Sequence, residues 1–407
     1  MRNLFEGIRI IDFTNNVAGP SATSLFADFG AEVIKIEKPS GDDNRRFSPF
    51  IEGESITAMW LNRSKKSLVL DMKQPKAVEI AKALIAEADV VVESFRPGMM
   101  KKWGLNYDEL IEIKPDIIMC SITGYGQTGP ESNKPGYDMI AQAISGYMYM
   151  SGSPDGPPTK IGPAVGDWVG GLNAFGYISA ALYYRQATGE GQYIDISLIE
   201  GLIGVNEYCE PAFNGIVPMR CGNHMVYIAP YGVFAGRDGE IVIAATSERL
   251  WARLCELMGR QELLGDERYV NAGMRAKNNE TLIPIIESWL QSFASVEEPY
   301  KLLEERGIAC CKVNAMTDVI HNEHLQARGA FVDLKTTAIS SGKIIARGVV
   351  PKLSKTPGTV AFTPALGEHT DEVLKNRLGY SDEEIEKLSS EGVINTSAKV
   401  KGGENRP

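Results

Sequence analysis

The stretch IRIIDFTNNVAGPSATSLFADFGAEVIKIE, residues 8–37, decides the fold. It opens with a strand-like apolar run over 8–13, continues with a helix-like segment over 21–29 and closes with a second strand-like run over 32–37. Two strands joined by a helix of this kind lie parallel, because the crossover returns the chain to the same end of the sheet. The sequence therefore begins with a β-α-β unit.

The same alternation continues to about residue 122. Strand-like runs follow at 67–70, 90–92 and 117–122, and helix-like segments at 75–87 and 99–103 lie between them. Short apolar strands separated by amphipathic helices predict an α/β fold in which an open parallel sheet carries helices on both faces. Ligands of such sheets bind beyond the carboxyl ends of the strands. Four loops are expected to meet at that edge, over residues 14–20, 71–73, 94–98 and 123–130.

The chain is long enough for more than one domain. Residues 1–205 are predicted to form the first part of a large domain, and residues 206–327 a smaller α+β domain. The predicted strands and helices of the smaller domain lie at 231–234, 241–243, 250–257 and 281–293. A third segment, 328–394, contains a predicted helix over 381–388, and the polar tail 395–407 is expected to be disordered.

Composition excludes several classes of protein. The 407 residues carry a formal charge of -10, which argues against a nucleic-acid surface. The chain has no apolar signal region and no membrane-spanning run, so we expect a cytoplasmic protein with no membrane partner. Its six cysteines lack a C-x-x-C pair, which suits free thiols in a reducing compartment.

Basic side chains are concentrated in the first quarter of the chain. A local basic patch on an acidic protein suits an anionic small molecule. For any single one of these side chains, an ordinary position on the solvated surface is about as good an explanation as anion binding. These side chains are Arg45, Arg46, Arg63, Lys65, Lys66, Lys73, Arg96, Lys101 and Lys102.

The loop after the strand at 117–122 carries Gly124, Gly126 and Gly129 in the spacing G-x-G-x-x-G. A dinucleotide site also needs a helix that starts at the third glycine and an acid about 20 positions on. Instead, Pro130 and Pro135 follow the glycines. The sequence therefore does not predict a nicotinamide site.

The four histidines offer one metal-like pair, His321 and His324, at helical i, i+3 spacing. No third ligand is evident nearby, so no metal site is expected. The chain also lacks a G-x-S-x-G elbow and a Walker sequence. The usual motifs of serine hydrolases and of P-loop proteins are therefore absent from the sequence.

Asp167 stands alone among apolar and glycine residues in the segment 160–171. It could cap a helix that begins near Trp168, and taken alone this structural role is the more common one. A carboxylate can also act as a nucleophile and form a covalent intermediate. The residues by themselves leave both roles open.

Motifs along the whole chain resemble those of the class III coenzyme A transferases, the family of formyl-CoA transferase and crotonobetainyl-CoA:carnitine CoA-transferase. Individually the motifs are weak, but together and in family order they are highly specific. They are Asp12-Phe13-Thr14 with Ala18-Gly19-Pro20, the run 29–37, Leu70-Asp71-Met72-Lys73, Thr123-Gly124-Tyr125-Gly126, Gly166-Asp167, the run 188–192 and Gly367-Glu368-His369-Thr370.

The resemblance implies a fold and an assembly. It implies a Rossmann-like large domain that the C-terminal segment 328–394 completes, a small α+β domain, and two chains interlocked as a homodimer. It also implies acyl-CoA and a small carboxylic acid as substrates, with coenzyme A as a substrate and no covalently bound cofactor in the resting enzyme.

The resemblance also assigns site residues. Asp167 takes the place of the family's catalytic aspartate; ionised at neutral pH, it would attack the thioester carbonyl and form an anhydride and then an aspartyl-CoA thioester. The implied CoA-binding residues are Asn16, Val17, Ala18, Lys38, Leu70, Asp71, Met72, Lys73, Ser94, Phe95, Arg96, Lys102 and Tyr137.

The chain departs from the family pattern in three places. Val17 stands where formyl-CoA transferase has a glutamine, and residues 220–260 contain no counterpart of that enzyme's four-glycine loop. Oxalate or formate specificity is therefore not expected. The lysine found just before the matching tyrosine is also missing, since Pro135 and Gly136 precede Tyr137.

Two alternatives stay open. The first is an isomerase that resembles α-methylacyl-CoA racemase, which carries a Gly-His-Asp segment where this chain has Gly136-Tyr137-Asp138. Tyrosine, with a pKa near 10, is a poor replacement for a histidine base, so the sequence favours a transferase. The second is a CoA-binding protein without catalysis, in which Asp167 would be dispensable.

Overall fold

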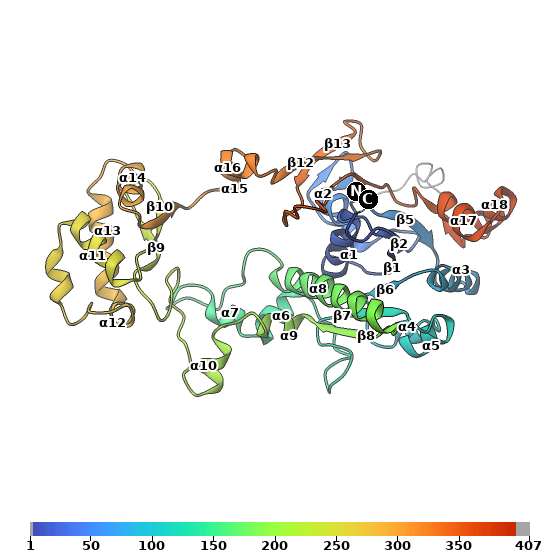
Figure 1. Cartoon of the computed structure of the whole chain (residues 1–407), viewed down its shortest axis with the longest axis horizontal. Helices are drawn as coiled ribbons and strands as arrows, with labels where there is room; N and C mark the ends of the chain where they lie inside the picture. The colour runs from blue at the N-terminus through green and yellow to red at the C-terminus, as the bar shows by residue number, and fades with distance from the viewer. Residues whose placement is uncertain (1–2, 396–407) are drawn as a thin grey trace. The chain divides into compact units, whose positions relative to one another are not determined.

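The computed structural model describes residues 3–395 and divides the chain into two compact units (Figure 1). The large unit contains the residues up to 145, then 162–205 and the segment from 323 onward. The small unit contains Gly146–Ile161 and Asn206–Asn322. The stretch 146–161, which the sequence placed in the large domain, thus belongs to the small unit, and the second boundary falls at 322 rather than 327.

The large unit is built on a seven-stranded sheet with the order β15-β5-β2-β1-β6-β7-β8. Every neighbouring pair is parallel except the last strand, β15, which runs antiparallel to β5. The strands are β1 (Arg9–Asp12), β2 (Glu32–Glu37), β5 (Lys66–Leu70), β6 (Val90–Glu93), β7 (Ile118–Thr123), β8 (Tyr193–Ser197) and β15 (Ile394–Asn395). Asn395 is therefore ordered in a strand, against expectation, and the remaining tail, 396–407, lies outside the described residues.

The strand order locates the ligand edge. Numbered along the chain, the six parallel strands lie in the order 3-2-1-4-5-6, which is that of the dinucleotide-binding fold. The order reverses between β1 and β6, and ligands of such sheets bind at this switch point, beyond the carboxyl ends of the strands. The prediction of an α/β fold with a large, mainly parallel sheet is confirmed.

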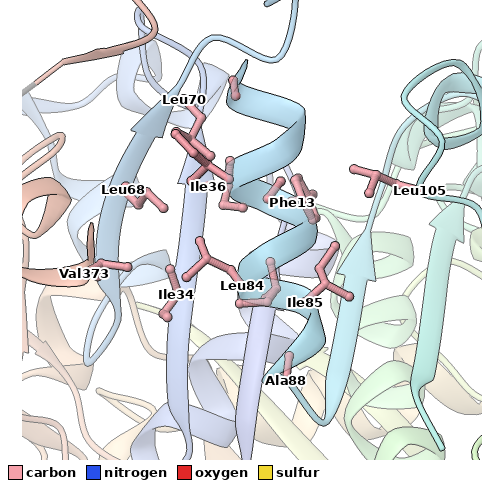
Figure 2. Close-up of a cluster of buried hydrophobic side chains, with 14 of the residues drawn as sticks. Phe13, Ile34, Ile36, Leu68, Leu70, Leu84, Ile85, Ala88, Leu105 and Val373 are labelled. Atoms are coloured by element: carbon pink, nitrogen blue, oxygen red, sulfur yellow. The ribbon is translucent and has the colours of Figure 1, made fainter. Parts of the chain in front are cut away.

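Helices cover both faces of the sheet. The face drawn in Figure 2 packs Phe13, Ile34, Leu68 and other strand side chains against Leu84 and Ile85 of α3. On this face lie α3 (Pro75–Ala86), α4 (Met99–Lys102), α5 (Tyr107–Ile113), α17 (Thr370–Leu378) and α18 (Asp382–Ser390). Elsewhere α1 (Ala18–Asp28) packs against the longest helix, α8 (Val165–Thr188), and α8 also contacts α6 (Asp138–Ile144) and α9 (Leu198–Ile203).

A second, smaller sheet of the large unit covers α2 (Ile56–Leu61). Its strands are β13 (Lys343–Arg347), β12 (Phe331–Thr336) and β14 (Phe362–Thr363), in that order. Leu334, Ile344 and Ala346 pack on Met59 of α2. The segment after residue 327 thus joins the large unit both here and through α17, α18 and β15. The short elements η1 (Asp43–Arg46), β3 (Phe50–Ile51), β4 (Glu54–Ser55) and α16 (Glu323–Ala327) complete this unit.

The small unit has its own core of α+β type. Its antiparallel sheet has the order β11-β10-β9, and Trp251, Tyr269 and Leu282 are buried beneath it. The strands are β9 (Tyr231–Ala235), β10 (Glu240–Ala244) and β11 (Ala309–Lys312), and the main helices are α11 (Glu248–Met258), α12 (Ala272–Lys277), α13 (Asn279–Gln291) and α14 (Glu297–Glu305). The shorter elements are α7 (Tyr147–Met150), α10 (Cys209–Phe213), η2 (Gln261–Gly265) and α15 (Met316–Val319). Across residues 3–395, no helix has the length and apolar character required to cross a bilayer.

Candidate active site

A pocket of about 140 Å³ opens at the switch point of the sheet. It lies among the loops that follow β1, β6 and β7 and the first turns of α1, α6 and α8. Seven of the residues proposed from the sequence line it together: Asn16, Ala18, Ser94, Phe95, Arg96, Tyr137 and Asp167. The structure thus brings the nucleophile candidate to the same pocket as six of the thirteen proposed CoA-binding residues.

Asp167 lies in the first turn of α8, which begins at Val165 rather than near Trp168. The N-cap residue is Ala164, so Asp167 does not hold the capping position that the sequence had left open. The side chain is half-buried and lines the pocket. Within the described residues, its carboxylate forms no hydrogen bond and no ion pair, which leaves both oxygens available to a ligand.

Asp138, at the start of α6, is the charged residue that acts on the pKa of Asp167. Its Oδ1 accepts the Gly166 backbone N–H at 2.7 Å, and its Oδ2 accepts a hydrogen bond from Gln142 at 2.8 Å. Burial and the charge of Asp138 raise the pKa of Asp167 to about 7. At neutral pH a substantial fraction of the Asp167 side chains is therefore protonated, whereas the sequence led us to expect the ionised form.

Asn16 is held by the loop that follows β2. It adopts the left-handed conformation, with φ 64°, directly before α1. Its backbone N–H donates to Asp42 Oδ1 at 3.0 Å, and its carbonyl accepts from Asn44 Nδ2 at 2.9 Å. Val17 follows as the N-cap of α1. These contacts fix the backbone of the first pocket loop without using the Asn16 side chain.

Buried charges support this loop from below. The Lys35 ammonium donates to the Thr14 carbonyl at 2.6 Å and pairs with Asp42 at 2.9 Å, while Lys65 pairs with Asp12 at 3.0 Å. Burial opposes ionisation of Asp12, but two neighbouring ammonium groups and two hydroxyls outweigh it and hold the pKa of Asp12 well below its usual range. Burial lowers the pKa of Lys65 to about 8. Charges without these partners would be costly to bury.

The loop after β6 is fixed by short hydrogen bonds. The Asn15 backbone N–H donates to Ser94 Oγ at 2.8 Å, which joins the loops after β1 and β6 across the switch point. The Phe95 N–H donates to the buried carboxylate of Glu93 at 2.7 Å, and the Phe95 ring packs edge-on against Trp103. Arg96 is thereby presented at the pocket from an anchored backbone.

The glycines of the loop after β7 allow a close backbone contact. A Cβ on Gly124 would lie 2.6 Å from the Cα of Gly136, closer than non-bonded carbon atoms approach. Both glycines line the pocket. No helix follows until α6 begins at Asp138. The first glycine of the G-x-G-x-x-G spacing therefore serves this loop contact, and the spacing does not lead into a phosphate-binding helix N-terminus.

Six residues proposed from the sequence lie elsewhere on the large unit: Lys38, Leu70, Asp71, Met72, Lys73 and Lys102. Lys38 pairs with Asp43 at the surface, and Lys102 ends α4 with an exposed side chain. Leu70 is completely buried in the core, so neither its side chain nor its backbone is exposed to a ligand.

Other residues of the pocket were not among the assigned site residues, although two of them lie in loops that the sequence placed at the ligand edge. Asn15 and Thr123 line it, and Asp138 acts on it through Gly166. Asn15 could have been found, because it lies beside Asn16 at the end of the same strand. Asp138 gave no comparable signal, since its effect depends on how α6 packs against α8. Among residues 3–395, no cluster of three or more His, Cys, Asp or Glu side chains could hold a metal ion.

Comparison with known proteins agrees with this geometry. The profile of CoA-transferase family III matches residues 5–370. Succinyl-CoA–L-malate CoA-transferase beta subunit of Chloroflexus aurantiacus is 37% identical over 95% of this chain and 97% of its own length. Succinyl-CoA:glutarate CoA-transferase of Mus musculus is 38% identical over 96% of this chain and 90% of its own length. The crystal structure of a CAIB/BAIF family protein from Brucella suis superimposes with a TM-score of 0.82 at 32% identity, covering 93% of this chain and 100% of that one.

Proposed function

The chain belongs to CoA-transferase family III, and we propose that it moves CoA from an acyl-CoA thioester to a carboxylic acid through covalent intermediates on Asp167. The family resemblance predicted from the motifs is thereby confirmed. The observation that carries the mechanism is the Asp167 carboxylate, half-buried and without a protein partner in the pocket at the switch point. A carboxylate in such a place is available for nucleophilic attack.

The proposed reaction consists of two exchanges. An Asp167 oxygen attacks the thioester carbonyl, the C–S bond breaks, and a mixed anhydride and CoA thiolate form. The thiolate then attacks the Asp167 carbonyl of the anhydride, which releases the donor acid and leaves an aspartyl-CoA thioester. The acceptor carboxylate repeats both steps in reverse. Each thioester bond that breaks is replaced by an anhydride or by another thioester, so the free energy of the thioester is conserved and is not lost through hydrolysis.

The names of the relatives narrow the choice of substrates to test. Both curated relatives described above use succinyl-CoA by name, with malate or glutarate as partner acid. We therefore propose a dicarboxylic acid as acceptor and succinyl-CoA as the first donor to test. A panel of acyl-CoA donors and carboxylic acids, read by mass spectrometry, tests this. Exchange of a substrate α-proton with deuterated solvent, without transfer, would instead support the racemase alternative.

The pH dependence of transfer follows from the raised pKa of Asp167. The nucleophile is the anion, so the single-turnover rate should rise with pH, with a midpoint near 7, and level off about one pH unit above it. Asp138→Asn keeps an oxygen for the Gly166 N–H but removes a neighbouring charge. It should move the midpoint to lower pH, since burial remains as the only cause of the shift. A midpoint unchanged in this variant would contradict the proposed coupling.

We propose that CoA follows the pocket rim and the basic residues near it. Lys73, Arg96 and Lys102 are the cations assigned to its anionic groups, and Arg96 lines the pocket itself. Replacing all three with Ala should weaken CoA binding at least about a hundredfold, because each charge-assisted contact contributes to affinity. Titration calorimetry measures this. A control variant with the same loss of charge replaces Lys76, Lys101 and Lys114, and equal weakening in the control would contradict the assignment.

We also propose the interlocked homodimer. Helices α6 and α8 expose large apolar side chains, each more than half accessible: Tyr137, Met139, Leu172, Tyr177 and Tyr183. Large apolar side chains exposed on two neighbouring helices are of the kind that protein interfaces cover. Mass photometry at nanomolar concentration should give about twice the chain mass of 44.5 kDa, because interlocked chains separate only by unfolding. A monomer mass under these conditions would contradict the proposal.

A further inference from the structure

The first turn of α8 needs support from outside the helix. Its N-cap, Ala164, provides no side-chain hydrogen bond. One turn later come Gly170 and Gly171, where a Cβ would lie 2.4 Å from the Leu198 side chain and 2.1 Å from Ser21 Oγ. Two adjacent glycines allow this close packing but weaken a helix, because their backbone is the most flexible. The turn that carries Asp167 is thus weakly tied to the rest of α8.

Two contacts hold this turn. The first is the hydrogen bond from the Gly166 N–H to Asp138. The second is a stack on Trp168, the residue after Asp167. The guanidinium carbon of Arg347 lies 4.7 Å from the centroid of the Trp168 ring and 4.5 Å from that of Trp60. Arg347 ends β13 and Trp60 belongs to α2, so the stack joins α8 to the C-terminal sheet and to α2.

The guanidinium of Arg347 is not paired with a carboxylate in the part of the chain that the structure describes. Within residues 3–395 it forms neither an ion pair nor a side-chain hydrogen bond. Arg63, which lies 3.5 Å from the Trp60 centroid, differs because it pairs with Asp28 at 2.6 Å. Burial and the charge of Arg63 lower the pKa of Arg347. Arg347 is an exposed residue, so water solvates part of its charge, and the two aromatic faces attract the guanidinium and determine where it lies.

We propose that Arg347 is a positioning residue for the nucleophile: by stacking between Trp60 and Trp168 it fixes the first turn of α8 and the direction in which Asp167 points. The inference rests on the proposed function of Asp167. It assigns no substrate contact to Arg347. Small misplacement of a reacting group lowers the rate of the chemical step much more than it changes substrate binding.

The test compares Arg347→Gln and Arg347→Lys with Lys343→Gln. Lys343 lies on the same strand, has an exposed side chain like Arg347, and pairs only with the exposed Asp333. Arg347→Gln should lower kcat roughly tenfold and leave KM for acyl-CoA within about twofold. Arg347→Lys, which keeps the positive charge, should recover part of the loss, and Lys343→Gln should match the parent protein.

Hydrogen exchange tests the geometry without any substrate. The Trp168 amide donates to the Ala164 carbonyl at 3.1 Å, and this bond belongs to the first turn. Its exchange should become faster in Arg347→Gln and stay unchanged in Lys343→Gln. If no substrate pair is turned over, the proposed function fails but this measurement still decides the positioning role. Unchanged exchange, unchanged kcat, or a loss confined to KM would each overturn the inference.

Discussion

Asp167→Asn should lower CoA transfer by at least about a thousandfold, because the amide nitrogen and oxygen are poor nucleophiles toward a thioester. The parent protein, incubated with a productive acyl-CoA and no acceptor, should contain a fraction of chains heavier by the CoA moiety. Hydroxylamine should convert Asp167 in that fraction to a hydroxamate. Intact and peptide mass spectrometry detect both products, and neither should form in the variant.

The control for this experiment is Asp138→Asn, which alters the nearest carboxylate but keeps the nucleophile. The adduct should still form in it, and it should map to Asp167. An adduct at Asp138, or near-normal transfer by Asp167→Asn, would show that the mechanism is wrong even though the family is established. Circular dichroism checks that each variant is folded.

Asp167→Asn should also change the stability of the folded protein. A folded-state pKa of about 7 means that folding favours the protonated form, so ionisation of Asp167 costs stability as pH rises from about 4 to above 7. The full shift corresponds to about 4 kcal/mol, and we expect about 1–2 kcal/mol because water screens a half-exposed group. Asp167→Asn should be more stable than the parent by this amount at pH 8 and equal to it near pH 4.

The sheet could be predicted from the sequence because its parallel strands are buried on both faces. Runs such as 90–92 and 117–122 are then almost continuously apolar, and the helices between the strands are amphipathic. Two strands of the sheet were not predicted: β8, an edge strand that is only partly buried, and β15, whose two residues lie next to β5 after α18. The segment 146–161 was misplaced for a similar reason, since its assignment to the small unit depends on tertiary contacts.

Site residues could be predicted where local sequence motifs identify them. Their properties could not be predicted where these depend on tertiary packing. Asp167 and the loop residues Asn16 and Ser94 could be named from motifs and strand ends. The raised pKa of Asp167 could not, because it arises from burial and from a carboxylate that another helix brings close. Leu70 matched a motif, yet its side chain is fully buried in the core, where its role is packing.

Asp42 and Asp43, neighbours in sequence, should differ strongly in how much stability the same substitution costs. The Asp42 carboxylate is completely buried and pairs with the equally buried Lys35 at 2.9 Å. Asp42→Asn leaves that ammonium without a full counter-charge, which should cost about 3–5 kcal/mol of unfolding free energy. Asp43 pairs with Lys38 at the surface, both about 48% exposed, and Asp43→Asn should cost less than about 1 kcal/mol.

The Asp42→Asn substitution should also affect the active site. Asp42 Oδ1 accepts the Asn16 N–H, which holds that residue in its left-handed conformation at the pocket. An amide side chain cannot satisfy both this donor and the Lys35 ammonium as two carboxylate oxygens do. We therefore expect KM for acyl-CoA to rise in Asp42→Asn, and urea unfolding followed by circular dichroism to show its lower midpoint. Equal stability of the two variants would mean that the buried charges do not support the loop, since the two positions differ chiefly in burial.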